Sequence, residues 1–240
     1  MWQKDKGILL GFVRHNDKTG IAHIFTLNDG YVPFIYHLST SVKGQRRNSL
    51  LQPLTLVGFE SQIMQGRDLQ HMKDPANAHP FTSIPFNPVK SCIALFLGEF
   101  LSCALRREEC NRPLFRLLEK SIVWLDSTDD PANIHIYTML QVAALIGIRP
   151  NTDDFQPGFW FDLQSGRFGA QPSHQDCMSP ELAWKTVQLL NCGDVTESES
   201  IKMTGSERAG LVSLLNTYFR IHVPGFPVLK SVDVLKSVFS

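Results

Sequence analysis

Hydrophobic and polar positions alternate through the first eighty residues with the period of β-strands. Four runs rich in β-branched and aromatic residues are followed by a shorter fifth run. The predicted strands cover residues 7–15, 21–27, 31–38, 50–63 and 69–73. The connectors "NDKTG" and "NDG" carry residues that tolerate the backbone conformations of tight turns. The pattern predicts a small antiparallel meander that closes into a barrel, because closure removes exposed strand edges.

From about residue 82 the hydrophobic period becomes that of helices. Three helix starts pair a capping residue with a proline, at Asn87-Pro88, Asp130-Pro131 and Ser179-Pro180. The helix from Asn87 is apolar almost all round, which places it at the centre of a helical domain. Further apolar stripes predict helices around residues 114–125, 137–147 and 184–190, one after a capping box at Thr204 and Glu207, and one over residues 227–239.

These elements predict a two-domain α+β protein. An N-terminal small antiparallel β-barrel over residues 1–80 is followed by an all-α helical domain over residues 81–240. A short irregular insertion lies near residues 150–178. Within it "FDLQSGRF" predicts a hairpin with Ser165-Gly166 at its turn.

Composition fits a folded protein of this size, since 43% of the 240 residues are hydrophobic and 19% are charged. The start of the chain lacks the pattern of a secretory signal, and no apolar stretch reaches the roughly 20 residues of a membrane span. We therefore expect a cytoplasmic protein without membrane association. The five cysteines are scattered and odd in number, which predicts reduced thiols.

The formal net charge is zero, yet the two parts differ. Residues 1–80 hold nine Lys/Arg against six Asp/Glu, a net charge of +3, which leaves −3 for residues 81–240. This asymmetry indicates that the first part faces any polyanionic partner.

Motifs of catalysis are absent from the sequence. It contains no G-x-S-x-G, no P-loop and no G-x-G-x-x-G, and its eight histidines are dispersed, so we expect no enzyme and no cofactor. A metal-free hydrolase stays open only if the fold brings a nucleophile and a histidine together. His174 and Cys177 have the spacing of half a zinc site, but Cys192 ends an apolar helix, and we expect no bound metal.

A small barrel can bind single-stranded nucleic acid through a cationic groove and exposed aromatic rings. The candidate cations are Lys4, Lys6, Arg14, Lys43, Arg46, Arg47 and Arg67, and the candidate stacking residues are Trp2, Phe34 and Tyr36. The alternative is that residues 43–47 form a solvated loop and that the aromatic residues belong to the core.

Several motifs resemble those of the RecO family of bacterial recombination mediators. They are Gly7-Ile8-Leu9-Leu10, Val42-Lys43-Gly44 followed by Arg46-Arg47, and Leu51-Gln52-Pro53-Leu54. The resemblance continues through residues 97–126, "GFWFDLQSGRF" and residues 222–239, and so covers almost the whole chain.

This resemblance implies an OB-fold barrel joined to a helical domain. It also implies a non-enzymatic, nucleoid-associated mediator that binds single- and double-stranded DNA and anneals strands. With RecR, such a protein helps to load RecA onto DNA coated by the single-strand-binding protein. The alternative is a protein-interaction adaptor that does not bind DNA.

Two further implications concern the helical domain. In the family this domain receives the acidic C-terminal tail of the single-strand-binding protein, for which Arg106, Arg107, Arg116 and Lys120 are candidate contacts, although they could equally form a solvated helix face. Many members also carry a four-cysteine zinc site after the third helix, where this chain keeps only Cys177. We expect packing of aromatic residues to replace the metal there, through Phe155, Trp160, Phe161 and Phe168.

Overall fold

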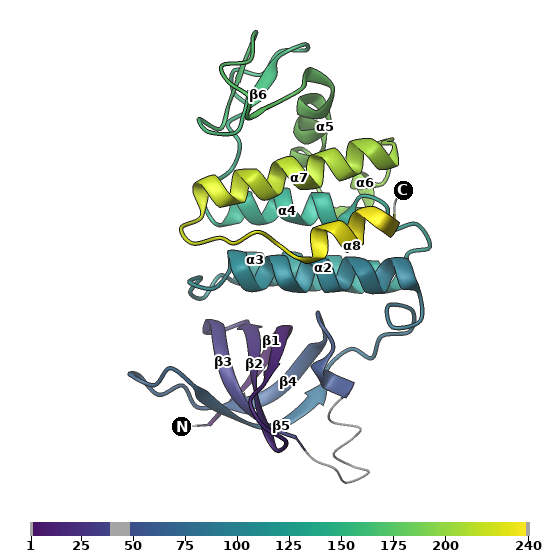
Figure 1. Ribbon diagram of the computed structural model, residues 1–240. Helices are drawn as coiled ribbons and strands as arrows, with labels where there is room; N and C mark the ends of the chain where they lie inside the picture. The colour runs from purple at the N-terminus through teal and green to yellow at the C-terminus, as the bar shows by residue number, and fades with distance from the viewer. Residues whose placement is uncertain (1, 39–48, 239–240) are drawn as a thin grey trace. The chain divides into compact units, whose positions relative to one another are not determined.

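The computed structural model describes residues 2–38 and 49–238. It contains two compact units, Met1–Ser127 and Thr128–Ser240. A closed five-stranded barrel begins the first unit, and helices follow it along the chain (Figure 1). The expected fold class, a small barrel followed by a helical region, is confirmed. The division at residue 80 marks the change from strands to helices, and as a statement about domains it stays a prediction.

The barrel closes in the strand order of an OB-fold. Its strands are β1 (Gln3–Arg14), β2 (Thr19–Thr26), β3 (Gly30–His37), β4 (Leu56–Ser61) and β5 (Gln70–Asn77), arranged β1-β2-β3-β5-β4 with β4 hydrogen-bonded to β1. All neighbours are antiparallel except β3 and β5, which are parallel. The prediction of a simple meander is therefore wrong at this connection, because β4 returns to β1 and leaves β5 to close the barrel against β3.

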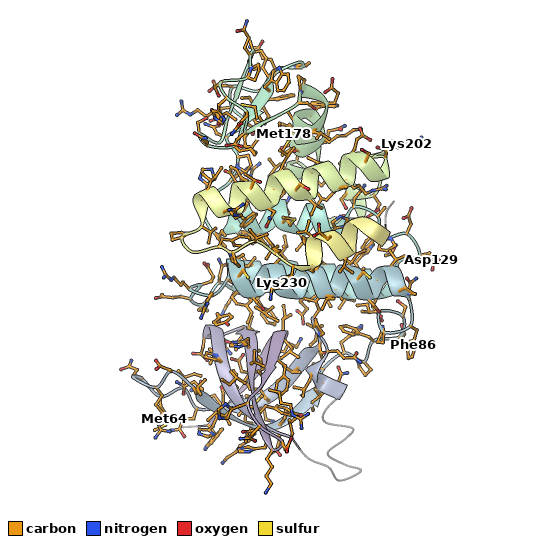
Figure 2. All side chains as sticks on the ribbon, viewed as in Figure 1. Met64, Phe86, Asp129, Met178, Lys202 and Lys230 are labelled. Carbon is orange, nitrogen blue, oxygen red and sulfur yellow. The ribbon has the colours of Figure 1, made fainter. Side chains whose placement is uncertain are left out.

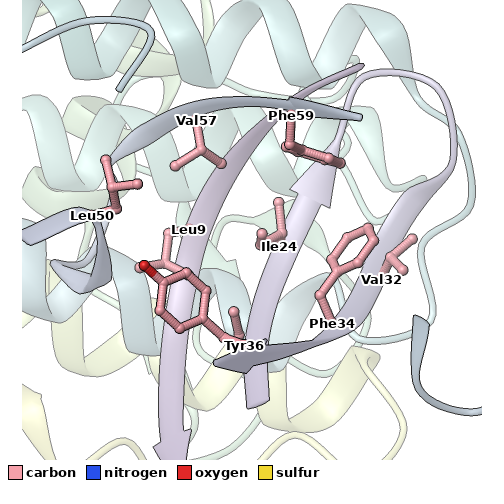
Figure 3. Packing of buried hydrophobic residues seen from close by; sticks show 9 residues of the cluster. Leu9, Ile24, Val32, Phe34, Tyr36, Leu50, Val57 and Phe59 are labelled. Atoms are coloured by element: carbon pink, nitrogen blue, oxygen red, sulfur yellow. The ribbon is translucent and has the colours of Figure 1, made fainter. Parts of the chain in front are cut away.

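The barrel interior is filled by large side chains that alternate along the strands. Val32, Phe34 and Tyr36 follow one another at every second position of β3 and all point inward (Figure 3). The Phe34 ring packs edge-on against Phe59 of β4, with 5.2 Å between ring centroids. This packing fixes the register of the strands, because a shift by one residue would turn these rings outward.

β1 is buried on both faces over its central residues. Leu9 points into the barrel core, whereas Ile8 and Leu10, on the opposite face, are also almost fully buried. Helix α2 (Pro88–Ala104) packs against this outer face so closely that a Cβ on Gly98 would lie 3.0 Å from the carbonyl oxygen of Leu10. Only glycine permits this approach.

Helix α3 (Arg112–Ser127) also packs against the barrel. The ring of its Phe115 lies 6.3 Å, centroid to centroid, from Phe25 of β2. The first turns of α3 are thereby held near the N-terminal end of β1, as the 2.7 Å ion pair between Lys6 and Glu119 shows.

The fourth strand begins later than the sequence pattern predicts. Residues 49–51 form a short 3-10 helix, η1 (Ser49–Leu51), and β4 starts only at Leu56. Pro53 has no N–H to offer a strand pair, and the next residue, Leu54, adopts a positive φ of 65°. The apolar run is therefore interrupted by a tight turn, in which the N–H of Leu54 donates to the carbonyl of Leu9 at 2.7 Å.

A buried carboxylate holds the segment that leads from the barrel into α2. Asp126, at the end of α3 and only 5% exposed, accepts hydrogen bonds from the backbone N–H groups of Thr82, Ser83 and Ile84 at 2.8–2.9 Å. Lys90 donates to the backbone carbonyl of Asp126 at 3.0 Å. Burial opposes ionisation of Asp126, but the donors outweigh it and lower its pKa to about 2.

The second unit is a helical assembly with a small sheet. Its helices are α4 (Ile134–Leu145), α5 (Pro180–Leu190), α6 (Val195–Ser198), α7 (Gly205–His222) and α8 (Ser231–Val238). The strands β6 (Trp160–Asp162), β7 (Arg167–Gly169) and β8 (Cys177–Met178) pair in the order β7-β6-β8. The predicted hairpin is confirmed, and Gly166 at its turn has a φ of +67°.

Two of the predicted helix starts are confirmed in full. The side chain of Asn87 accepts from the N–H groups of Val89 and Lys90, and Thr204 and Glu207 form the predicted capping box. Ser179 occupies the capping position of α5 without a side-chain capping bond.

Two helices begin later than predicted. The last helix begins at Ser231 and not at residue 227. Helix α4 begins at Ile134 and not at Pro131, because Asn133 is fixed by other contacts. The side chain of Asn133 donates to the carbonyls of Ser198 and Ile201, each at 2.8 Å, and its N–H donates to the Glu199 carboxylate at 3.0 Å.

No helix in the described part of the chain is both long enough and apolar enough to cross a membrane.

Replacing Asp126 by alanine should destabilise the first unit by about 3–5 kcal/mol, because several buried donors lose their charged acceptor together. Chemical denaturation measures the effect. The exposed Asp68 provides the matched control, and D68A should stay within about 0.5 kcal/mol of the wild type. Equal stabilities of D126A and D68A would contradict the role given to Asp126.

Burial, reinforced by the charge of Asp130, raises the pKa of Glu199 to about 7 from its ordinary 4.5. The folded state therefore holds a proton that the unfolded state loses, and stability should fall as the pH rises from about 4.5 to about 7. E199Q should flatten this part of the stability profile, measured as the midpoint of thermal unfolding at several pH values. D153N, at an exposed carboxyl of the same unit, should leave the profile unchanged.

Candidate nucleic-acid interface

A groove with four cations lies in the first unit, where the N-terminal end of β1 meets the first turns of α3. Lys4 and Lys6 stand on the same face of β1 as the buried Ile8, but beyond the area that the helices cover. The groove encloses about 530 Å³. We call it the basic groove; its lining residues are Lys4, Asp5, Lys6, Leu27, Asn28, Arg112, Phe115, Arg116 and Glu119.

Some of these charges are already paired. Lys6 donates to Glu119 at 2.7 Å, and Arg112 donates to the side-chain oxygen of Asn28 at 3.0 Å. Asn28 in turn donates to Asp5 at 2.9 Å. These contacts fix the wall of the groove before any ligand binds.

Two cations are not committed in this way. In the part of the chain that the structure describes, the Lys4 and Arg116 side chains form no ion pair or hydrogen bond, and both are exposed. Burial raises the pKa of Asp5, and the nearby Asp29 carboxylate raises it further. With four cations and two carboxylates in its lining, the basic groove carries a net positive charge and presents two free cations.

An aromatic ring stands near the basic groove along the barrel surface. Lys4 pairs in register with Glu60 of β4, which pairs with Lys73 of β5. The Lys73 ammonium lies 3.9 Å from the centroid of the Trp2 ring. Trp2 is partly exposed, and it remains the one of the three predicted stacking residues that a base could reach.

The other two predicted stacking residues are wrong. Phe34 is fully buried and Tyr36 is 4% exposed, and both belong to the barrel core (Figure 3). Their positions at every second residue of β3 direct them inward, as the core alternative expected.

The remaining barrel cations are not gathered into one cluster. Arg14 lies about 30 Å along β1 from Lys4, at roughly 3.3 Å per residue, and it pairs with Asp17 at 2.9 Å. Arg67 is exposed in the connection between β4 and β5, the segment that carries Met64 (Figure 2). Because Gln3 pairs with Ser61, this connection leaves the sheet at the same end as Lys4.

The other three predicted DNA contacts, Lys43, Arg46 and Arg47, lie outside the described residues. Their role stays a prediction from the sequence.

A second groove of the first unit is largely apolar and contains Arg106. It encloses about 580 Å³ between the barrel and α2. We call it the apolar groove; it is lined by Leu10, Gly11, Phe12, Val13, His23, Tyr31, Leu51, Pro53, Leu95, Glu99, Ser102, Cys103 and Arg106. The Tyr31 hydroxyl and Nδ1 of His23 are hydrogen-bonded at 2.7 Å, and burial, followed by the charge of Arg106, lowers the pKa of His23.

The four predicted contacts for a partner tail are thus distributed over different surfaces. Arg106 lines the apolar groove and Arg116 lines the basic groove. Arg107 and Lys120 are exposed and line neither groove.

The sequence did not predict a role for two cations, Arg112 in the basic groove and Lys73 beside Trp2. Arg112 begins α3, and the N-terminus of a helix favours anions. Its position at a predicted helix start was therefore a signal for an anion contact. Lys73 ends the predicted fifth strand, but its neighbours Glu60 and Trp2 come from other strands, and their proximity has no sequence signal.

In the second unit, Asp162, His174 and Cys177 bring one potential metal ligand each to within 4.8 Å of one another. They lie in the insertion where the RecO resemblance predicts a lost zinc site.

Comparison with known proteins now adds to this geometry. Residues 85–231 match the family model described as recombination protein O C terminal. The chain is 38% identical to the DNA repair protein RecO of Bacteroides fragilis and 37% identical to that of Phocaeicola vulgatus, over the full length of both chains in each case. The chain belongs to the RecO family. A RecO protein of Porphyromonas gingivalis, 31% identical over 98% of each chain, extends this agreement.

The match to the RecO family includes the residues of the basic groove. The matched family model starts at residue 85 and so covers Arg112 and Arg116. Lys4 and Lys6 precede it, but they fall within the length over which the relatives are compared with this chain.

Proposed function

We propose that this chain is a non-enzymatic recombination mediator that binds single- and double-stranded DNA in the basic groove. Its place in the RecO family gives it a role in DNA repair. The observation that carries the proposal is the convergence of Lys4 and Lys6 from the barrel with Arg112 and Arg116 from α3.

The basic groove has the chemistry of a phosphate track. Lys4 and Arg116 offer free charges, and the first turn of α3 adds the positive end of a helix dipole. Trp2 could stack on an unpaired base at one side of this track. Contacts of this kind depend on the phosphates and not on base identity, as an annealing protein that must accept any repair intermediate requires.

The proposed partners follow from the same surfaces. With RecR, the chain would help to load RecA onto DNA coated by the single-strand-binding protein. The apolar groove supports a site for the acidic C-terminal tail of that protein, because exposed Val13 and Leu95 could receive an apolar side chain while Arg106 attracts a carboxylate. Binding to chromosomal DNA would place the protein at the nucleoid.

Removing the two free cations of the basic groove should weaken DNA binding and its salt dependence. K4A combined with R116A should lower the slope of log K against log salt by about 1.4–1.8, at 0.7–0.9 per phosphate contact. Fluorescence anisotropy with labelled single- and double-stranded DNA at several salt concentrations measures this slope.

The control pair, R107A with K120A, removes the same two residue types from positions outside both grooves and should leave the slope nearly unchanged. A triple variant with Lys43, Arg46 and Arg47 changed to alanine is measured in the same way. A slope lower by about 2–3 would show that these cations contact phosphates. Equal slopes for the two double variants would remove the basic groove from the proposal. No binding of the wild type at low salt would favour the adaptor function.

Glu119 lowers the positive charge of the basic groove and holds Lys6 in an ion pair. E119Q removes this charge and should raise DNA affinity about two- to fivefold, as a gain of ~0.5–1 kcal/mol implies. E109Q changes the net charge equally at an exposed position outside the groove and should have a smaller effect. Weaker DNA binding by E119Q would show that Glu119 positions Lys6 and does not mask it.

A further inference from the structure

The insertion between α4 and α5 is organised around one carboxylate. Asp162 ends β6, the central strand of the small sheet, and pairs in register with Cys177 on β8 and Arg167 on β7. The segment from residue 163 to residue 176 leaves this strand and returns to it. In many RecO proteins a four-cysteine zinc site closes this region, as the resemblance implied, so the residues here can be tested for their fit to a metal.

His174 does not present a free ring nitrogen to the cluster. Its Nδ1 accepts a hydrogen bond from the backbone N–H of Asp176 at 3.0 Å, so Nδ1 carries no proton. The tautomer assigned from this network has its proton on Nε2, which donates to Oδ1 of Asp162 at 2.9 Å. A histidine that binds a metal ligates through its unprotonated nitrogen. In His174 the nitrogen that contacts Asp162 is the protonated one, and the unprotonated Nδ1 is already occupied by the N–H of Asp176.

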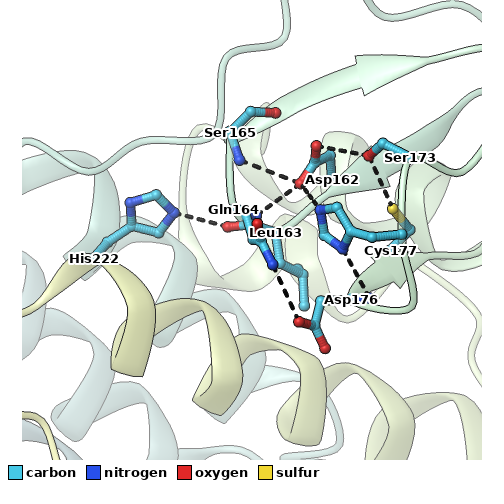
Figure 4. A network of polar contacts seen from close by, with 9 residues as sticks. Asp162, Leu163, Gln164, Ser165, Ser173, Asp176, Cys177 and His222 are labelled. Atoms are coloured by element: carbon cyan, nitrogen blue, oxygen red, sulfur yellow. Dashed lines mark hydrogen bonds and ion pairs between the residues drawn. The ribbon is translucent and has the colours of Figure 1, made fainter.

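The other potential ligands fit a metal no better. Ser173 donates to Oδ2 of Asp162 at 2.8 Å and lies 3.6 Å from the sulfur of Cys177 (Figure 4). To coordinate zinc, His174 would have to give up its hydrogen bond to Asp176 or lose a further proton. Asp162, His174 and Cys177 therefore do not fit the zinc site that the family resemblance implies.

Asp162 instead collects donors from two separate parts of the returning segment. The backbone N–H groups of Gln164 and Ser165, in the turn, donate to Oδ1 at 2.8 and 3.2 Å. The side chain of Ser173 supplies a third donor (Figure 4), and Nε2 of His174, the next residue, supplies the fourth. Burial works against the ionised form, but these four donors outweigh it and hold the pKa of Asp162 well below its usual range.

We propose that Asp162 replaces the metal as the centre of this insertion, through a clasp formed by Asp162, Gln164, Ser165, Ser173, His174 and Asp176. A zinc site joins chain segments through a central cation and surrounding electron-pair donors. The Asp162 clasp joins them through a central anion and surrounding hydrogen-bond donors.

Contacts with α7 continue from the clasp. The N–H of Leu163 donates to the carbonyl of Asp176 at 3.1 Å, and the Leu163 carbonyl accepts from Nε2 of His222 at 2.8 Å (Figure 4). One residue before the clasp, the Phe161 ring lies 5.7 Å from that of Tyr218. The clasp thus holds in place the segment that packs against α7. In RecO proteins with four cysteines, the metal would do this.

The first test uses the full wild-type chain. Elemental analysis should find no stoichiometric zinc, and a chelator should leave the midpoint of thermal unfolding unchanged. Nitrogen-15 NMR should assign the Nε2-protonated tautomer to His174. One zinc per chain, or a His174 ring protonated on Nδ1 only, would falsify the proposal even if every variant failed to fold.

Matched variants separate the clasp from a metal site. D162N should lower the unfolding midpoint by about 5–10 °C, because an amide cannot accept all four donors. D153N, at an exposed position of the same insertion, should stay within about 2 °C of the wild type, and so should C177S. If C177S loses bound zinc or falls as far as D162N, the metal site is retained; if D162N equals D153N, Asp162 is not the centre of the insertion.

Discussion

The burial of β1 on both of its faces is the constraint on which the first unit depends. Leu9 completes the barrel core, while Ile8 and Leu10 require cover from outside, which the close approach of α2 at Gly98 provides. Toward its N-terminus β1 extends beyond the area that α2 covers, and Lys4 and Lys6 are exposed there. The helices that cover the middle of β1 thus also bring the start of α3 beside Lys4 and Lys6. The basic groove forms between them.

In both units a carboxylate with several hydrogen-bond donors holds an irregular segment in place. Asp126 binds three successive backbone N–H groups of the segment that enters α2, and Asp162 binds donors from both parts of the insertion that precedes α5. In both places an irregular segment must satisfy its backbone donors without a strand or helix partner. A single ionised side chain satisfies several of them together, and the low pKa of each group reflects that number of donors.

Local signals in the sequence predicted the elements well and the contacts between elements poorly. Alternation in β3 and the capping residues Asn87 and Thr204 identify their elements because the physical cause lies within a few residues. The start of α4 was missed because Glu199 and Arg208, far along the chain, hold Asn133. For the candidate site, Lys4, Lys6 and Arg116 could be selected by charge, but their convergence depends on the packing of α3 against β2. Phe34 and Tyr36 were misassigned because an aromatic residue in a strand has the same sequence signal whether it faces a base or the core.

The zero net charge of the chain is compatible with a DNA-binding surface once its distribution is considered. The basic groove combines four cations with two carboxylates, and burial disfavours the charged form of one of these, Asp5. Screening at physiological salt limits electrostatic attraction to roughly 8 Å, so a bound phosphate responds to the charges that line the groove and not to the net charge of the whole chain. A small number of free cations gives modest affinity and a shallow dependence on salt, because the salt slope grows with the number of phosphate contacts. Modest, reversible binding of this kind would suit the mediator proposed above, which would release the strand to a filament-forming partner.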